Sequence, residues 1–247
     1  MNASAVLFRL RMMFMAVIIC LGFWAPWIQA WGIGSRISLL EWLALELSRT
    51  GLVSFTVATP VVIACGALIA GLGAVLRIWG SAWLGHGVVL HGQMQAGTLM
   101  AGGPYRHVRN PLYLGLWCVI AALALLMPAT GALFVFLAVP LLLFWLILGE
   151  EAFLTAQIGE PYRAYLRSVP RLLPRLRTAL KPSGHKPHWI QAVLSEINPI
   201  GVFLTIAFLS WTYDIRLMWR AILVTFGLSL VVRALMPGIP EASTALE

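Results

Sequence analysis

The chain has 247 residues, of which 60% are hydrophobic and 11% are charged, and its mean hydropathy is +0.88. Soluble domains are about 25% charged, so this composition indicates an integral membrane protein and excludes an ordinary water-soluble domain. The formal net charge of +8 does not predict nucleic-acid binding. The basic residues lie between apolar segments, where they set the orientation of the chain and face anionic lipid headgroups.

Six apolar segments are long enough to be membrane spans, since crossing the hydrocarbon takes about 20 mostly apolar residues. They cover residues 12–31, 52–79, 111–128, 131–149, 198–213 and 217–236. We therefore predict an all-α, polytopic helical membrane protein with about six transmembrane helices. Between the first two spans, residues 35–49 mix leucines with charged residues, which predicts a short helix that lies in the membrane interface.

The positions of arginine and lysine predict the orientation in the membrane, because positively charged loops stay in the cytosol. Arg9 and Arg11 place the N-terminus there. An even number of spans puts residues 80–110 and 150–197 on the same side, and the second of these segments is rich in arginine. We expect these loops to face the cytosol, in a protein of the bacterial inner membrane.

Two patterns that might suggest a ligand have simpler explanations. Gly71 and Gly73 lie in the second span without a third glycine or a preceding strand, so they predict close helix packing rather than a nucleotide site. Two histidine pairs lack a third ligand, so no metal site is predicted. These pairs are His86 with His91 and His185 with His188.

The first segment with functional character runs from Thr98 to Gly115 and reads TLMAGGPYRHVRNPLYLG. Gly102, Gly103 and Pro104 require a fixed turn, and Pro111 suits the first position of a helix. Two interpretations remain open from these residues alone. The segment is either a positively charged membrane flank with a tyrosine anchor or a binding loop at the membrane edge.

The second segment runs from Glu150 to Pro174 and reads EEAFLTAQIGEPYRAYLRSVPRLLP. Glu150 and Glu151 are expected at the carboxyl end of the fourth span, where they oppose the helix dipole by about 0.3–1 kcal/mol each. A partner cation would explain them, and a hairpin of the third and fourth spans brings them near residues 109–113. The residues that follow suggest a short amphipathic helix with a proline-rich exit, suited to act as a lid: Tyr162, Tyr165, Val169 and Pro170.

Together the two segments resemble the isoprenylcysteine carboxyl methyltransferase family and its phospholipid methyltransferase relatives, over residues 60–180. In the first segment the matching residues are Leu99, Gly103, Pro104, Tyr105, Arg109, Pro111, Tyr113 and Gly115. In the second they are Glu150, Glu151, Leu154, Gly159, Tyr162, Tyr165, Val169, Pro170, Arg171 and Pro174. The resemblance divides the chain into an N-terminal span with an interfacial helix (1–51), a methyltransferase-like membrane core (52–180) and a C-terminal extension with two spans (181–247).

The resemblance implies that S-adenosylmethionine binds in a cytosolic-side pocket and that a lipophilic acceptor enters from the bilayer. It implies adenosine contacts from Thr98, Leu99 and Met100. It places Tyr105, Asn110, Pro111, Leu112 and Tyr113 around the methionine part of the cofactor, and Glu150 at its ammonium group. Such contacts suit a zwitterion with a sulfonium, and methyl transfer depends on alignment and exclusion of water. No metal is predicted, and the sequence assigns no catalytic residue.

Three departures from the family pattern affect the prediction. Asn110 replaces the usual histidine, and two further spans at 198–236 have no counterpart in the family core. Leu146 stands where prenylcysteine methylators have an arginine for the substrate carboxylate. Because an unpaired carboxylate is costly among apolar groups, we expect a neutral amine, thiol or similar acceptor rather than a carboxylate.

Two other classes of function remain open. A membrane reductase of the sterol-reductase type has a similar loop and glutamate pair but binds NADPH, whose extra phosphate favours basic residues such as Arg106, Arg109 and Arg163. A non-catalytic lipid-binding protein would bind neither cofactor. The sequence identifies neither the acceptor nor the oligomeric state, and the predicted partners are the lipophilic substrate and membrane lipids.

Overall fold

The computed structural model describes residues 3–24, 37–84, 102–177, 180, 186–212 and 214–235. Over these residues the secondary structure is helical, and β pairing is limited to the isolated bridge between Ser38 and Pro128. The all-α class predicted from the composition is therefore confirmed.

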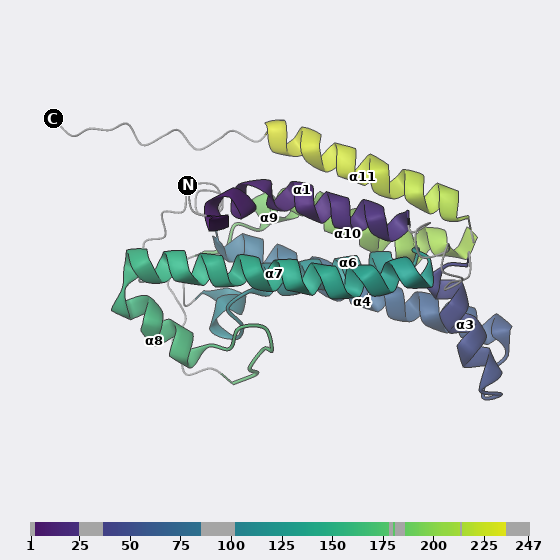
Figure 1. Cartoon of the computed structure of the whole chain (residues 1–247). Coiled ribbons are helices and arrows are strands. Elements are labelled where there is room, and N and C mark those ends of the chain that lie inside the picture. The colour runs from purple at the N-terminus through teal and green to yellow at the C-terminus, as the bar shows by residue number, and fades with distance from the viewer. Residues whose placement is uncertain are drawn as a thin grey trace.

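The long helices lie side by side in one bundle (Figure 1). In chain order the elements are α1 (Ala3–Phe23), α3 (Leu39–Arg49), α4 (Phe55–Leu84), the 3₁₀ turn η2 (Gly103–Arg106), α6 (Pro111–Ala124), α7 (Ala129–Ile158), α8 (Glu160–Ser168), α9 (Trp189–Ser195), α10 (Ile197–Leu204), the π-helical turn η3 (Thr205–Leu209), the 3₁₀ turn η4 (Ser210–Thr212) and α11 (Ile215–Leu235). Figure 1 shows α8 at one end of the bundle and α3 at the other, with α1 beginning and α11 ending toward the α8 end.

Among the described residues, two helices, α4 and α7, are long and apolar enough to cross a membrane. A third span is counted if α9 and the helical segment Ile197–Thr212, which are bent by 66° relative to one another, act as one. The predicted spans near the N-terminus and at residues 111–128 correspond to the shorter apolar helices Leu10–Phe23 and Pro111–Ala124. The protein is an integral membrane protein, and helices occur at all six predicted positions.

Two predicted helix ends were wrong. The fourth span was expected to end at residue 149, but α7 continues to Ile158, where Gly159 adopts a positive φ of 75°. Glu150 and Glu151 therefore lie inside a helix and not in its last turn. The unfavourable interaction with the helix dipole that was expected for them does not apply, because that effect is confined to the last turn. At the N-terminus, α1 begins at Ala3, so Arg9 and Arg11 belong to the helix rather than preceding it.

Glycines allow α4 and α6 to approach closely. A Cβ atom on Gly73 would lie 2.7 Å from the carbonyl oxygen of Gly115, and one on Gly115 would lie 2.8 Å from the carbonyl oxygen of Gly73. Gly71 faces the ring of Phe203, which would be 3.1 Å from such a Cβ. The packing interpretation of Gly71 and Gly73 is confirmed, and the backbone contact fixes where α6 lies along α4.

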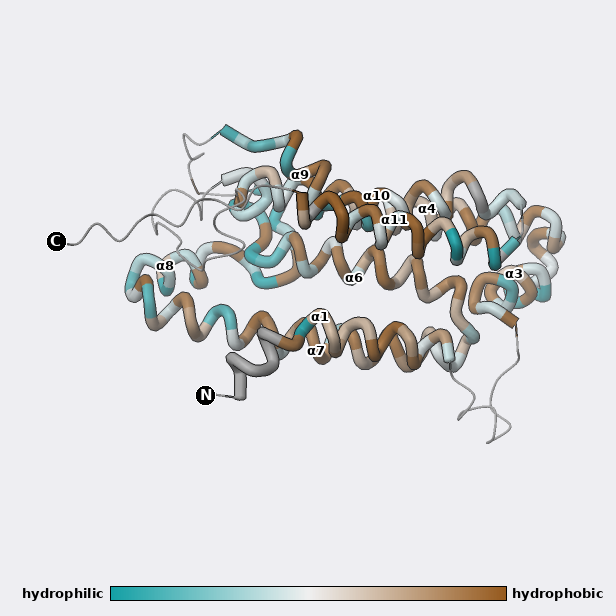
Figure 2. The backbone as a smooth tube through the Cα atoms, turned by 90° about the horizontal axis from the view of Figure 1, so that it is seen from above, coloured by the Kyte–Doolittle hydropathy of each residue, from teal (hydrophilic) through white to brown (hydrophobic). Residues whose placement is uncertain are grey.

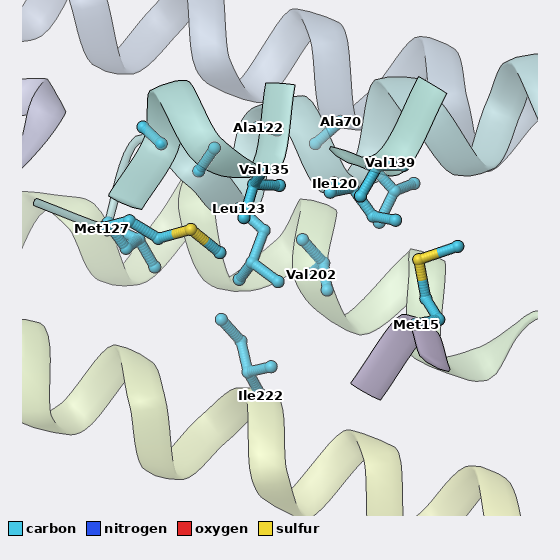
Figure 3. Close-up of a cluster of buried hydrophobic side chains, with 14 of the residues drawn as sticks. Met15, Ala70, Ile120, Ala122, Leu123, Met127, Val135, Val139, Val202 and Ile222 are labelled. Carbon is cyan, nitrogen blue, oxygen red and sulfur yellow. The ribbon is translucent and has the colours of Figure 1, made fainter. Parts of the chain in front are cut away.

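One cluster of buried side chains joins the N-terminal, central and C-terminal helices (Figure 3). Its members include Met15 of α1, Ala70 of α4, Ile120 of α6, Val135 of α7, Val202 of α10 and Ile222 of α11. The two C-terminal helices therefore share the core of the central helices instead of forming a separate unit.

The end of the bundle at α3 is closed by a capped helix. Ser38 and Glu41 form a capping box, in which the Ser38 hydroxyl accepts from the Glu41 amide and the Glu41 carboxylate accepts from the Ser38 amide. The Leu39 amide also donates to the carbonyl oxygen of Met127, in the turn between α6 and α7, at 2.7 Å. The short helix predicted here is confirmed. Figure 2 shows predominantly hydrophobic residues along the long helices and more hydrophilic ones at α8.

Candidate functional site

The two sequence segments with functional character meet at the α8 end of the bundle. The chain after α8 runs beside the loop that precedes α6, and backbone groups join the two. The Arg109 amide donates to the Pro170 carbonyl oxygen at 2.9 Å, and the Arg175 amide donates to the His107 carbonyl oxygen at 2.9 Å. The His107 Nδ1 atom also lies 2.7 Å from the Arg175 carbonyl oxygen. Each segment thus fixes the conformation of the other.

Side chains reinforce this contact between segments. The Asn110 amide Nδ2 donates to the Arg171 carbonyl oxygen at 3.1 Å, and the Tyr165 hydroxyl donates to the Tyr105 carbonyl oxygen at 2.8 Å. Arg106 donates to the carbonyl oxygen of Leu180. The Asn110 amide, which replaces the usual histidine of the family pattern, therefore connects the two segments.

Glu151 is the centre of a buried ion-pair cluster. Its side chain is 10% exposed and accepts from Arg109 Nη1 at 2.8 Å and from Arg171 Nη2 at 2.7 Å. Arg109 Nε also donates to the Val169 carbonyl oxygen at 2.6 Å. The hydrogen bond to Glu151 raises the pKa of Arg171 above its ordinary value. The partner cation expected for the acid pair is therefore present, but it holds Glu151 in a structural role.

Glu150 has a different environment from its neighbour. The Tyr113 hydroxyl donates to Glu150 Oε2 at 3.1 Å, which confirms that the hairpin of α6 and α7 brings the acid pair beside the beginning of α6. The charge of Arg11, on α1, acts electrostatically on both Glu150 and Tyr113. Glu150 is half-buried, whereas Glu151 is buried. The two adjacent acids therefore differ in partners and in access.

The Tyr105 hydroxyl is buried and has no hydrogen-bond partner within the described part of the chain. Burial raises the pKa of this phenol well above its ordinary value, and the nearby Tyr165 and Glu150 raise it further. Tyr105 belongs to η2, which is held close to α4 because Gly103 has a positive φ of 47° and a Cβ there would overlap the indole ring of Trp83. A buried hydroxyl without a protein partner leaves a hydrogen bond to be made with a water molecule or a ligand.

Helix α8 covers the end of α7. Tyr162 and Tyr165 are buried in a small cluster with Leu154 and Val169. Burial raises the pKa of both phenols above the ordinary value, and neighbouring charges of Glu151 act in the same direction. The amphipathic helix predicted after the acid pair is confirmed, and its tyrosines face the protein interior.

Six of the nine residues proposed to contact the cofactor are described, and all six lie where the two segments meet. We refer to this group as the polar corner: Tyr105, Asn110, Pro111, Leu112, Tyr113 and Glu150. The other three, Thr98, Leu99 and Met100, lie outside the described residues, as do three of the histidines considered as metal ligands, His86, His91 and His185.

Sequence reasoning missed an ion pair at the same corner. Arg77, the sole charged residue of α4, contacts Glu196, which lies between α9 and α10, and Ser81 contributes a hydroxyl. A lone arginine in an apolar helix is itself a signal, because a buried cation needs a partner within the protein. That signal predicts a buried acid, but only the packing of the helices identifies it as Glu196.

Apolar helices, with a cluster of carboxylates, arginines and tyrosines at one end of the bundle, define an integral membrane protein with a partly buried polar region at the edge of its spans. Residues 61–160 match the sequence profile of the phospholipid methyltransferase family. The match covers less than half of the chain, and it confirms over these residues the resemblance inferred from the two segments. No match was found among curated proteins or among solved structures.

Proposed function

We propose that this protein transfers a methyl group from S-adenosylmethionine to a lipophilic acceptor in the membrane. The observation that carries the proposal is the group formed by Glu150, Tyr113 and the Tyr105 hydroxyl, which has no partner among the described residues. All three residues lie within the family-matched residues 61–160. When bound, the cofactor would supply a methyl group to a lone pair of the acceptor, while the carbon–sulfur bond breaks, its electron pair stays on sulfur and S-adenosylhomocysteine leaves.

The residues of this corner fit the amino-acid part of such a cofactor. A carboxylate has about four acceptor positions, so the hydrogen bond from Tyr113 leaves Glu150 able to accept from an ammonium group. Tyrosine faces suit a sulfonium, because the negative face of an aromatic ring attracts cations. The Tyr105 hydroxyl is a donor suited to the cofactor's carboxylate. Glu151 cannot serve in place of Glu150, since Arg109 and Arg171 occupy its carboxylate.

The proposed acceptor is lipophilic because the neighbouring helix surfaces are apolar. Trp117 of α6 and both Phe144 and Trp145 of α7 are exposed on the described surface, as a wall facing lipid requires. Leu146 is buried in the main core cluster at 4% exposure and offers no charge for a carboxylate. A neutral amine, thiol or similar group therefore fits this environment better than a carboxylate.

The contacts of the arginines favour this function over an NADPH-dependent reductase. Arg109 is engaged by Glu151 and the Val169 carbonyl oxygen, and Arg106 donates to the Leu180 carbonyl oxygen. Arg163 is 58% exposed and pairs with Glu160. All three of these described arginines already have protein partners, so none is left to bind the extra phosphate of NADPH.

Titration of the detergent-purified protein separates the alternatives. We expect S-adenosylhomocysteine to bind and NADPH not to bind, in calorimetric titrations of the same preparation. Binding of NADPH alone would instead support the reductase, and binding of neither compound would support a non-catalytic lipid-binding protein. We further propose that this corner faces the cytosol, as the arginine distribution predicts.

A further inference from the structure

The strongest feature that the proposed reaction does not use is a buried ion pair between α4 and the C-terminal helices. Arg77 donates from Nε to Glu196 Oε2 at 2.5 Å and from Nη2 to Glu196 Oε1 at 3.1 Å. The Ser81 hydroxyl donates to the same Oε1 atom at 2.6 Å. The Arg77 side chain is 16% exposed and that of Glu196 is 4% exposed. Two hydrogen bonds from one guanidinium to the two oxygens of one carboxylate fix the plane of the guanidinium.

The remaining guanidinium nitrogen of Arg77 contacts α6, which begins at the candidate site. Its Nη1 atom donates to the carbonyl oxygen of Leu112, in the first turn of α6, at 3.2 Å. The aliphatic part of Arg77 packs on Gly115, because a Cβ there would lie 2.7 Å from Arg77 Cγ. Leu112 in turn rests on Gly80, where a Cβ would lie 2.9 Å from Leu112 Cδ2. The beginning of α6 is therefore held against α4 by packing and by one charged hydrogen bond.

The ion pair also borders the polar corner itself. The buried Tyr105 hydroxyl is within electrostatic reach of Glu150, of Arg77 and of Glu196. The charge of Glu196 thus acts on the pKa of the same hydroxyl that the proposed function assigns to the cofactor.

We propose that Glu196 is a positioning residue of the candidate site: it orients Arg77, which fixes the first turn of α6 and with it Tyr113. The inference rests on the proposed function and gives the C-terminal extension a role in it. Without Glu196, the charge of Arg77 would be left buried and uncompensated, and the guanidinium would turn away from Leu112 to reach water. Glu196 would contact neither cofactor nor acceptor.

A double variant distinguishes positioning from simple stabilisation. Glu196→Gln leaves Arg77 unpaired, so it should lower the melting temperature and weaken S-adenosylhomocysteine binding about tenfold. Adding Arg77→Met removes the unpaired charge and should restore the melting temperature. It also removes the hydrogen bond to Leu112, so the affinity should remain about tenfold weaker. Glu196→Asp, which keeps the charge, should be intermediate in both measurements.

The matched control is Glu46→Gln, which breaks an exposed ion pair with Arg49 on α3 and should change neither measurement. Recovery of affinity together with melting temperature in the double variant would overturn the positioning role. So would wild-type affinity in Glu196→Gln. Ser81→Ala, which removes one donor to Glu196, is the milder variant if Glu196→Gln does not fold.

Hydrogen exchange keeps this inference separate from the proposed function. In the double variant, the amides of residues 105–116 should exchange faster than in the wild type, while those of α3 should not change. If the wild type does not bind S-adenosylhomocysteine, the proposed function fails. Faster exchange would then still support the positioning role, and unchanged exchange would overturn it.

Discussion

The same substitution at the adjacent acids Glu150 and Glu151 should affect different properties: ligand affinity at Glu150 and fold stability at Glu151. Glu150→Gln keeps the shape of the side chain and its capacity to accept from Tyr113, but removes the charge proposed to meet the cofactor's ammonium group. A hydrogen bond involving a charged group contributes about 1.5–3 kcal/mol, so affinity for S-adenosylhomocysteine should fall about 10- to 150-fold. The melting temperature should change little.

Glu151→Gln should instead destabilise the fold. It leaves Arg109, whose side chain is 14% exposed, and Arg171, at 35%, without their counter-ion. Removing one partner of a buried pair costs about 3–5 kcal/mol. Because Arg171 is partly solvated and glutamine still accepts hydrogen bonds, we expect about 2–4 kcal/mol here. The contact between the two segments should loosen, since Arg109 also holds the Val169 carbonyl oxygen.

The assay is calorimetric titration of both purified variants with S-adenosylhomocysteine, together with thermal melts in the same detergent. Each variant is the matched control for the other, because the chemical change is identical and the positions are adjacent. An unchanged affinity in Glu150→Gln with an intact melt would assign Glu150 to a solvated membrane edge. An unchanged melt in Glu151→Gln would refute the structural role of the arginine cluster.

Three further predictions follow from the topology, the packing and the proposed acceptor. In a variant without native cysteines, Ser168→Cys should resist a membrane-impermeant thiol reagent in intact cells while Ser54→Cys is labelled, and the reverse pattern would invert the orientation. Gly115→Val should prevent stable folding, because its side chain would overlap α4. Gly51→Ala should be milder despite the positive φ of 75°, because Gly51 lies in an open turn. Equal melting temperatures for the two variants would contradict the close contact of α4 with α6. Wild-type protein with labelled S-adenosylmethionine should methylate a component of a total lipid extract but not acetyl-farnesylcysteine. A base-labile methyl ester on the latter would show that the inference from Leu146 is wrong, and Leu146→Arg should be neutral or harmful for the native reaction.

The sequence alone determined the membrane class, the positions of the helices and the two segments of the candidate site. Hydropathy and glycine or proline punctuation are local properties, so they could be read without a fold. The segments also showed the resemblance to the phospholipid methyltransferase family, and the family match over residues 61–160 confirms it there. The sequence predicted helix ends less accurately. The fourth span was expected to end at residue 149, where no local signal ends a helix, and α7 continues to Ile158, just before Gly159.

Only the tertiary structure decided which charges meet. The resemblance singled out Glu150 for the cofactor, but nothing in the sequence assigned a partner to either acid. In the structure Glu151 accepts from Arg109 and Arg171, whereas Glu150 accepts from Tyr113. Likewise, nothing local connects Arg77 with Glu196, since they are far apart in the chain and meet because α4 packs against the C-terminal helices. A buried charge requires a partner, and sequence reveals that requirement, but the partner is chosen by the packing of helices in space.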